Sequence, residues 1–528
     1  MVNPIRPECI PMSHYNDDLK FNFLTFGKDY DRSISGDCLL ICFPGSKETF
    51  GPSSYFDSLN KSLNGILYNI LDEVNKNSTL QKENSFVSFD IPPNSVGANS
   101  NLRTIALFST GEGNKSTPVF LNKMCASLVS MNKQNGGRIS SYSILVCLDD
   151  VSACDIMLFC TQFPFISIEE TRFKGDCSEC DNKNKSKQIE RIEFVFKSED
   201  VKIKCDNLIN NAISTSKGLL FARDLTSAPS NYCNSVNMAA EVIKMAKDVG
   251  LDIKLLQQSE CEKLGMGAYL AVAQGSKSPP QFVHLTYKPK GEVKKRVAFV
   301  GKGITMDTGG YNIKHSMMHF MKGDMGGAAA VFGAAYATGL SKPKNVEVHF
   351  ISAICDNLIS AEAYHPGCII TASNGKTIEV GNTDAEGRLT LADALVYASK
   401  LNVDTIVDLA TLTGFNAKLF EGMYASVLVN DDNLFNTIQK CGKAVGEKFW
   451  QLPLDPDYKE YIISKIADLN NTTEGKAPIS TSALFLYEFV SKDISYAHID
   501  IAGCSGMENL GNGFGVKTIV SLIREFSD

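Results

Sequence analysis

Strongly apolar runs of strand length alternate with helix-like segments along this chain of 528 residues, and this alternation limits the possible folds most. The runs RTIALFS and SYSILVCL stand on either side of the helical pattern VFLNKMCASLVSM. Further along, RVAFV, VEVHFISAI, DTIVDLA and AHIDIAG are again separated by helical patterns. Strands that alternate with helices favour an α/β fold, in which helices cover the sheet.

The length of the chain predicts more than one domain. We expect an N-terminal α/β domain over residues 1–200, a linking helix over 201–225 and a second α/β domain over 226–528. The second domain has the more apolar strands, such as QFVHLTY and VEVHFISAI. Runs of this kind indicate a sheet that is buried on both faces.

Charge and cysteine usage limit the partners and the compartment. The net charge of −7 argues against a nucleic acid or an anionic membrane as partner, because these need a basic face. No apolar run has the length of a signal peptide or a transmembrane helix, so we expect a cytoplasmic protein. Most of the 16 cysteines stand singly in apolar segments, and we expect them to be reduced core residues. The close pair Cys177 and Cys180 cannot supply four zinc ligands, and we interpret it as a plain loop pair.

Charged residues gather beside glycines in three loops next to the strands and helices of the second domain. The loop GKGITMDTGGYNIK follows RVAFV, while MKGDMGG and NTDAEGR each precede a helix. The charged residues that we single out are Lys302, Asp307, Lys314, Asp324, Asp384, Glu386 and Arg388. Function collects at the carboxyl ends of strands in open α/β sheets, so we expect these side chains to lie together.

Four carboxylates in one place predict a metal centre. They would repel one another, and their pKa values would rise, unless cations neutralise them. Two divalent ions would do so, because carboxylate oxygens suit Mg²⁺, Mn²⁺ and Zn²⁺. Taken singly, each acid is more often a helix cap or a solvated turn residue, each lysine a surface charge and the arginine a salt-bridge partner. The metal hypothesis therefore depends on the whole set.

Two other motifs carry weaker signals. The stretch RVAFVGKGITMDTGG is similar to a nucleotide-binding turn, but Met306 stands where GxGxxG has its third glycine. His315 and His319 have the spacing of zinc-peptidase ligands, but Ser316 stands where that motif has its glutamate. We therefore expect ordinary loop histidines and no nucleotide site.

The segment NTDAEGRLTLADAL, residues 382–395, resembles the signature of the leucyl aminopeptidase family, the cytosolic di-zinc aminopeptidases. GKGITMDTGGYNIK, MKGDMGGAAAV, DLATLTG and HIDIAG also resemble family segments, in the expected order. The resemblance covers roughly residues 215–528. It implies an N-terminal α/β domain, a catalytic α/β/α domain with a central mixed sheet, and a homohexamer.

The resemblance also implies a role for each matched position. The implied metal ligands, of which Asp307 and Glu386 bridge the two ions, are Lys302, Asp307, Asp324, Asp384 and Glu386. Lys314 and Arg388 match the two catalytic residues, and Arg388 is implied to hold a bicarbonate that acts as general base. The implied substrate pocket includes Met321, Thr411, Gly414 and Ala502.

The implied roles agree with elementary chemistry. Lys302 can ligate a metal only as the neutral amine, which two nearby dications would favour. Lys314 would stay charged and stabilise an oxyanion. Asp324 would bind the free α-amine of a substrate, which would explain cleavage at N-termini only.

Two stretches depart from the family pattern. HSMMHF, between Lys314 and Met321, is one residue shorter than usual and carries histidines and methionines where small residues are common. Cys504 and Ser505 follow HIDIAG, where bulkier apolar residues are frequent. These departures leave the shape of the pocket open, whereas no implied ligand position is substituted.

We therefore expect a metal-dependent aminopeptidase of peptide catabolism. It would use a hydroxide bridged by two metals to remove N-terminal residues, preferably leucine and other apolar ones, from short peptides. Zinc is the expected ion, with manganese or cobalt as alternatives at the exchangeable site. The other hypotheses are a non-catalytic oligomer that binds nucleic acid or protein on the same fold, and a two-metal phosphoesterase. The intact ligand set argues against the first, and the lack of histidine ligands against the second.

Overall fold

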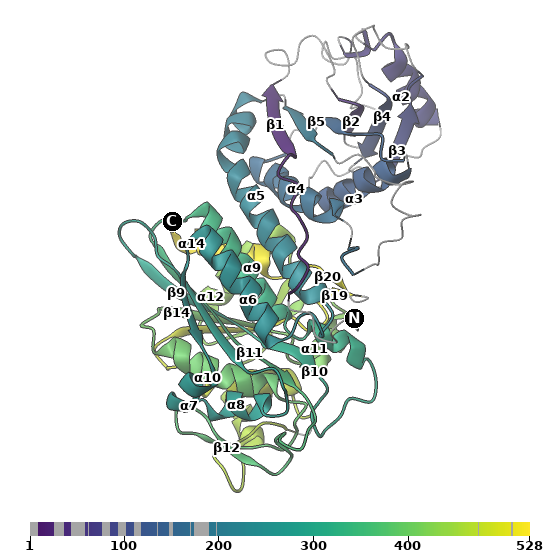
Figure 1. Cartoon of the computed structure of the whole chain (residues 1–528). Helices are drawn as coiled ribbons and strands as arrows, with labels where there is room; N and C mark the ends of the chain where they lie inside the picture. The colour runs from purple at the N-terminus through teal and green to yellow at the C-terminus, as the bar shows by residue number, and fades with distance from the viewer. Residues whose placement is uncertain are drawn as a thin grey trace. The chain divides into compact units, whose positions relative to one another are not determined.

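The computed structural model describes residues 9–25, 36–43, 57, 59–61, 63–76, 85–92, 102–109, 118–134, 136–146, 151–168, 170–173, 189–196, 198–473, 475–507 and 510–527. Cys177 and Cys180 lie outside the described residues. The chain divides into two compact units (Figure 1). The N-terminal unit is His14–Ser216, and the C-terminal unit is Met1–Ser13 with Lys217–Asp528.

The N-terminal unit contains a six-stranded sheet in the order β1-β6-β5-β2-β4-β3. Only β3 runs antiparallel to its neighbour. Leu39 and Ile41 of β2 face one apolar core, and Leu40 faces a second core on the opposite side of the sheet. Both faces of the sheet are therefore covered, as the α/β prediction requires. The elements are β1 (Lys20–Thr25), β2 (Cys38–Phe43), α2 (Ile66–Lys76), β3 (Ser85–Asp90), β4 (Thr104–Ser109), α3 (Pro118–Gln134), β5 (Ser141–Val146), α4 (Ala153–Ser167) and β6 (Arg191–Phe196).

The C-terminal unit is built on a mixed sheet in the order β16-β15-β18-β14-β9-β11-β8-β7, with β10 paired to β11. The central strands β18, β14, β9 and β11 are parallel, whereas β8 and β15 run antiparallel to their inner neighbours. The predicted central mixed sheet is thus confirmed. Its strands are β7 (Asp252–Leu256), β8 (Gln281–Tyr287), β9 (Lys295–Gly301), β10 (Gly303–Asp307), β11 (Val346–Asn357), β14 (Thr405–Ala410), β15 (Ala425–Val429), β16 (Phe449–Gln451) and β18 (Ser495–Asp500).

Helices cover both faces of this mixed sheet (Figure 1). On one face, α8 (Gly267–Ala273), α10 (Gly387–Ser399) and α13 (Pro478–Tyr487) share one large apolar core with the strands. On the other face, α9 (Gly326–Ser341) packs against β9 and β14 and contacts α6 (Ser235–Val249) and α14 (Val516–Ser527). This three-layer arrangement confirms the expected α/β/α architecture.

The long helix α5 (Glu199–Ser227) runs through the region of the expected linking helix and belongs in part to each unit. Ser13 donates hydrogen bonds from its backbone N and its Oγ to Asp224, near the end of α5, at 2.6 and 2.9 Å. The domain limits 1–200, 201–225 and 226–528 themselves stay a prediction.

No helix among the described residues combines the length and apolarity that a membrane span requires.

Shorter elements complete the C-terminal unit. They are α7 (Gln258–Lys263), the 3-10 helix η2 (Met318–Gly323), β12 (Ile369–Thr371), β13 (Thr377–Glu379), α11 (Gly414–Phe420), α12 (Asp432–Val445), the 3-10 helix η3 (Pro456–Ile462), β17 (Leu469–Asn470), β19 (Gly506–Met507) and β20 (Leu510–Gly511).

Candidate metal centre

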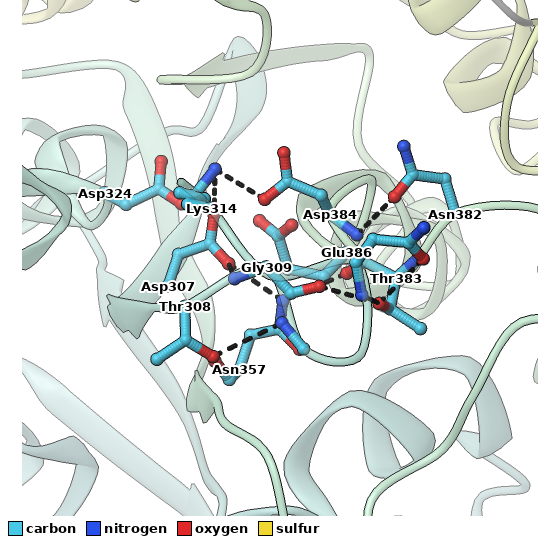
Figure 2. A network of polar contacts seen from close by, with 12 residues as sticks. Asp307, Thr308, Gly309, Lys314, Asp324, Asn357, Asn382, Thr383, Asp384 and Glu386 are labelled. Atoms are coloured by element: carbon cyan, nitrogen blue, oxygen red, sulfur yellow. Dashed lines mark hydrogen bonds and ion pairs between the residues drawn. The ribbon is translucent and has the colours of Figure 1, made fainter. Parts of the chain in front are cut away.

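Six of the charged residues singled out in the sequence meet at the carboxyl edge of the parallel strands. Figure 2 shows five of them, Asp307, Lys314, Asp324, Asp384 and Glu386. Lys302 directly follows β9, and Asp307 is the last residue of β10. Asp324 lies just before α9, and Glu386 is the residue that precedes α10. The two helices begin where the strands end, so their first turns bring these acids to the same edge.

Lys302 is the buried centre of one half of this cluster. Its Nζ lies 2.8 Å from Asp324 and 3.0 Å from Glu386 Oε1, and the residue is 3% exposed. Burial alone would lower the pKa of Lys302, but the charges of the neighbouring carboxylates outweigh it and raise the pKa above its ordinary value. A Cβ added to Gly387 would lie 2.3 Å from Lys302 Cε, so the glycine makes room for the lysine.

Lys314 joins the other half of the cluster. Its Nζ lies 2.8 Å from Asp307 Oδ2 and 2.6 Å from Asp384 Oδ1. Burial again opposes the charged form, but Asp307 and Asp384 raise the pKa of Lys314 above its ordinary value. Lys314 is therefore a cation held between two acids that come from distant parts of the sequence.

Three carboxylates of the cluster, those of Glu386, Asp324 and Asp384, have raised pKa values. Burial, followed by the charge of Asp307, raises the pKa of Glu386 to about 8. Burial raises the pKa of Asp324 to about 6, although Lys302 opposes the shift. The pKa of Asp384 is also raised, by burial and by Asp307. Four carboxylates surround two lysines here, so the negative charge exceeds what the lysines neutralise, which is the electrostatic condition that favours added cations.

The donor set fits a divalent metal ion. Asp307, Asp324 and Glu386 each offer an oxygen, and these oxygens lie within 4.8 Å of one another. Glu386 Oε2 is buried and has no hydrogen-bond partner among the described residues. An unpartnered buried carboxylate oxygen is costly unless a cation binds it. The residues present therefore suit a hard or borderline ion.

Sequence reasoning missed two residues that form hydrogen bonds around the cluster, Asn357 and Thr383. Asn357 Nδ2 donates to Asp307 Oδ1 at 2.8 Å and to the Thr383 carbonyl at 3.0 Å. Thr383 Oγ1 donates to the Gly309 carbonyl at 2.6 Å. Thr383 stands in the matched motif beside Asp384, but Asn357 carries no signal in the sequence beyond its place at the end of an apolar strand.

Arg388, in the first turn of α10, is half-buried. Burial lowers the pKa of Arg388 to about 10, against the opposing charges of Glu386 and Asp500. Its Nε is buried and has no hydrogen-bond partner among the described residues. The guanidinium thus has donors left for an anion, because this group binds oxyanions through paired N–H donors.

Of the four predicted pocket residues, Thr411 and Met321 contact residues of the cluster. Thr411 follows β14, donates from Oγ1 to Asp324 Oδ1 at 2.7 Å and accepts from Lys302 Nζ at its carbonyl at 3.0 Å. A Cβ added to Gly414, the first residue of α11, would meet no atom within 4 Å, so open space lies beside it. The Ala502 carbonyl accepts from Asn416 of α11. The Met321 carbonyl accepts from Asp324 N at 3.2 Å.

The histidines His315 and His319 are both exposed. His319 packs on the ring of Phe320, with ring centroids 4.0 Å apart. Within the described part of the chain, the group of residues able to hold a metal ion contains carboxylates only. His315 lies in a loop, as predicted, whereas His319 lies in η2.

Comparisons with known proteins agree with the fold and the cluster. Residues 220–520 match the cytosol aminopeptidase family, catalytic domain. A probable cytosol aminopeptidase of Prochlorococcus marinus is 48% identical over 351 residues, which cover 65% of this chain and 71% of that protein. Another, of Trichormus variabilis, is 41% identical over 500 residues, which cover 93% of this chain and 97% of that protein. A solved structure of a mutant tomato leucine aminopeptidase is 32% identical, has a TM-score of 0.82, and covers 98% of this chain and 99% of its own.

These matches extend over the residues of the acidic cluster and confirm the resemblance that the sequence motifs carry. The chain belongs to the cytosol (leucyl) aminopeptidase family of metal-dependent aminopeptidases.

Proposed function

We propose that this protein uses two divalent metal ions to remove the N-terminal residue from short peptides, with a preference for leucine and other apolar residues. The observation that carries the proposal is the buried carboxylate cluster, in which Glu386 Oε2 has no partner among the described residues. When bound, the ions would activate water and polarise the scissile carbonyl. The residues that would hold them are Lys302, Asp307, Asp324, Asp384 and Glu386.

Lys302 and Lys314 would have different roles. Lys302 is enclosed by Asp324 and Glu386, so it would bind a metal as the neutral amine once cations replace its proton. Lys314 is less buried, with a side chain 19% exposed, and would remain an ammonium group. An ammonium at the edge of the cluster is placed to stabilise the oxyanion that forms when the peptide carbonyl is attacked.

Asp324 supports the restriction to N-termini. The residue is 7% exposed, and its carboxylate is held by Lys302 and Thr411, so it has a fixed place at the edge of the cluster. There it would bind the charged α-amine of the substrate, because that amine supplies donors that an internal peptide group lacks. A blocked N-terminus would then leave the carboxylate without this partner, at a cost in binding.

Arg388 would bind the general base. Its unpartnered Nε and its position next to Glu386 suit a small oxyanion such as bicarbonate, which accepts paired N–H donors. The bound anion would take the proton of the attacking water and return it to the leaving amine. Arg388 itself keeps its charge, since even a pKa of about 10 lies well above neutral pH.

The preference for leucine is supported by the pocket. Met321, Gly414 and Ala502 carry no charged or hydrogen-bonding side-chain group of note, and the open space beside Gly414 would leave room for an apolar side chain. Discrimination among apolar side chains by size alone is modest, about 10- to 200-fold per methylene group. We therefore propose a preference, with several apolar residues accepted.

The proposal includes zinc as resident ion, with manganese or cobalt able to replace it at one site. It also includes a homohexamer, a cytoplasmic location and the domain limits 1–200 and 226–528. The family resemblance supports the assembly, and the description of the relatives as cytosol enzymes supports the location.

The test is release of a fluorophore from leucine amides by wild type, Asp384→Ala and the exposed-site control Asp457→Ala. We expect chelator to abolish the activity, Zn²⁺ or Mn²⁺ to restore it, and only Asp384→Ala to lack it. An N-acetylated leucine amide is expected to be inert. A metal-reconstituted protein that cleaves no free N-terminal amide would contradict the proposal and favour the binding-oligomer hypothesis. Cleavage of phosphate esters alone would favour the phosphoesterase.

A further inference from the structure

Asn357 connects the end of β10, at Asp307, to the loop that carries Asp384 (Figure 2). It is the last residue of β11, has no exposed surface and stands opposite Asp307 in the pairing of β10 with β11. Its Nδ2 donates to Asp307 Oδ1 at 2.8 Å and to the Thr383 carbonyl at 3.0 Å. Both partners are acceptors, so only the NH₂ of the amide suits them.

The two carboxylate oxygens of Asp307 have different partners. Oδ1 accepts from Asn357 Nδ2 at 2.8 Å and from Gly309 N at 2.9 Å. Oδ2 lies 2.8 Å from Lys314 Nζ, whereas the hydrogen bond from Asn357 goes to Oδ1. Two donors on one oxygen hold the carboxylate plane in place, and they leave the other oxygen for a cation.

The position of Asn357 is itself fixed on several sides. Its backbone carbonyl accepts from Thr308 N at 3.0 Å and from Thr308 Oγ1 at 2.9 Å. The Thr383 carbonyl, which it binds, also accepts from Tyr364 Oη at 3.0 Å. A hydrogen-bond partner that is itself held in place can fix the orientation of a metal ligand. The amide is therefore placed to set the distance between Asp307 and the segment that begins at Thr383.

We propose that Asn357 is a positioning residue of the metal centre, which holds Asp307 with Oδ2 toward the ions and keeps Asp307 in register with Asp384. The inference rests on the proposed two-metal function, because it gives both acids the role of ligands. Asn357 does not touch a metal or the substrate in this role. Partners of this kind orient metal ligands, and their loss lowers metal affinity or activity by about 10- to 100-fold.

Asn471 offers a matched control. It has no exposed surface and supports the same loop, since its Nδ2 donates to the Asn382 carbonyl at 2.7 Å and its Oδ1 accepts from Gly381 N at 2.9 Å. Its hydrogen bonds among the described residues go to backbone groups, and none goes to a carboxylate. Removal of its amide therefore weakens the loop without releasing Asp307.

The experiment is a zinc titration of metal-free wild type, Asn357→Ala and Asn471→Ala by calorimetry with a competing chelator. We expect Asn357→Ala to lose about 10- to 100-fold in zinc affinity and Asn471→Ala to lose clearly less. With zinc in excess, Asn357→Ala is expected to have a lower kcat on leucine amide and an unchanged KM. If Asn357→Ala does not fold, Asn357→Leu, which has a side chain of similar shape and no donors, takes its place.

Three results would overturn the positioning role. The first is wild-type zinc affinity in the Asn357 variant, because Asp307 would then bind zinc equally well without the hydrogen bond from Asn357. An equal loss in Asn471→Ala is the second, because general weakening of the loop would then be the cause. Wild type that binds no zinc is the third, and this result alone would also overturn the proposed two-metal function.

Discussion

Lys302 shows at the residue scale how the cluster balances charge. Its ammonium group is buried between Asp324 and Glu386, and no other cation among the described residues lies as close to both acids. A carboxylate that loses its only buried partner is strongly destabilising, since neither water nor another charge compensates it. Lys302 therefore contributes to the stability of the metal-free protein as well as to the proposed site.

Lys302→Met is expected to lower the free energy of unfolding of the metal-free protein by about 3–5 kcal/mol at pH 8. Methionine keeps most of the side-chain volume, so loss of the charge is the main change. Urea unfolding in chelator measures the effect, and Lys247→Met, at an exposed lysine of α6, is the control. A change in Lys302→Met as small as in the control would contradict the role of Lys302 as a buried counter-ion.

The residues of the cluster could be predicted from the sequence only where they stand in a recognisable motif. One segment of five positions contains Asp384, Glu386 and Arg388, so a single motif predicts all three. Asn357 stands 50 positions from its partner Asp307. Its part follows from the register of β10 on β11, and no spacing in the sequence encodes that register.

At the scale of elements, the antiparallel pair β8 and β11 buries two histidines that the sequence analysis did not single out. His284 Nε2 lies 3.0 Å from His349 Nδ1, and His284 Nδ1 lies 3.0 Å from Tyr397 Oη. Burial, followed by the charges of His349, Lys254 and Lys288, lowers the pKa of His284 to about 3. His284 therefore stays neutral in the folded protein at pH values where it is charged in the unfolded chain.

This shift makes the stability depend on pH in a defined direction. The pKa of His284 is lower in the folded state than the ordinary 6.5, so the unfolded chain binds the proton first as the pH falls. Stability is therefore lost as the pH falls from about 6.5 toward 3. Between pH 7 and pH 5, wild type is expected to lose about 2 kcal/mol more than His284→Gln.

Urea unfolding of both proteins at pH 7 and pH 5 measures this difference. His319→Gln, at an exposed histidine, is the control and is expected to follow wild type. Equal losses in wild type and His284→Gln would show that His284 does not resist protonation. The raised pKa values of Glu386 and Asp324 act equally in all three proteins, so they cancel from the comparison.

Elements with strong apolar patterns were predictable, and short or polar ones were not. The runs VEVHFISAI and DTIVDLA lie in β11 and β14, because a strand buried on both faces is apolar throughout. The small sheet of β12, β13 and β17 pairs segments of two or three residues, too short for any periodicity. The order of the strands in the sheets also could not be predicted, because strand pairing joins segments that are far apart in the sequence.

At the scale of the whole molecule, the match to the family is uneven. The family's catalytic domain matches residues 220–520, where the motifs lie, whereas the apolar patterns before that range predicted only an α/β unit. The structure of the N-terminal unit agrees with that class. Its role could not be predicted, because the sequence before residue 200 shows no motif comparable to the three charged, glycine-rich loops of the second domain.

The assembly is the prediction that belongs to this scale. We expect sedimentation of the active protein to give a mass near six times 57.6 kDa, as the family resemblance implies. The measurement is made at the concentration of the peptidase assay, because oligomers can dissociate on dilution. Full activity at the mass of a single chain would contradict the hexamer without affecting the metal centre.

The most direct test of the metal centre is a crystal structure of zinc-loaded protein, with anomalous diffraction measured at the zinc edge. We predict two anomalous peaks about 3.5–4 Å apart, both bound by the cluster of Asp307, Asp324 and Glu386, with Asp384 and Lys302 as further ligands. Peaks at His315 and His319 alone, or no peak at the carboxylates, would contradict the assignment of this cluster as a metal centre.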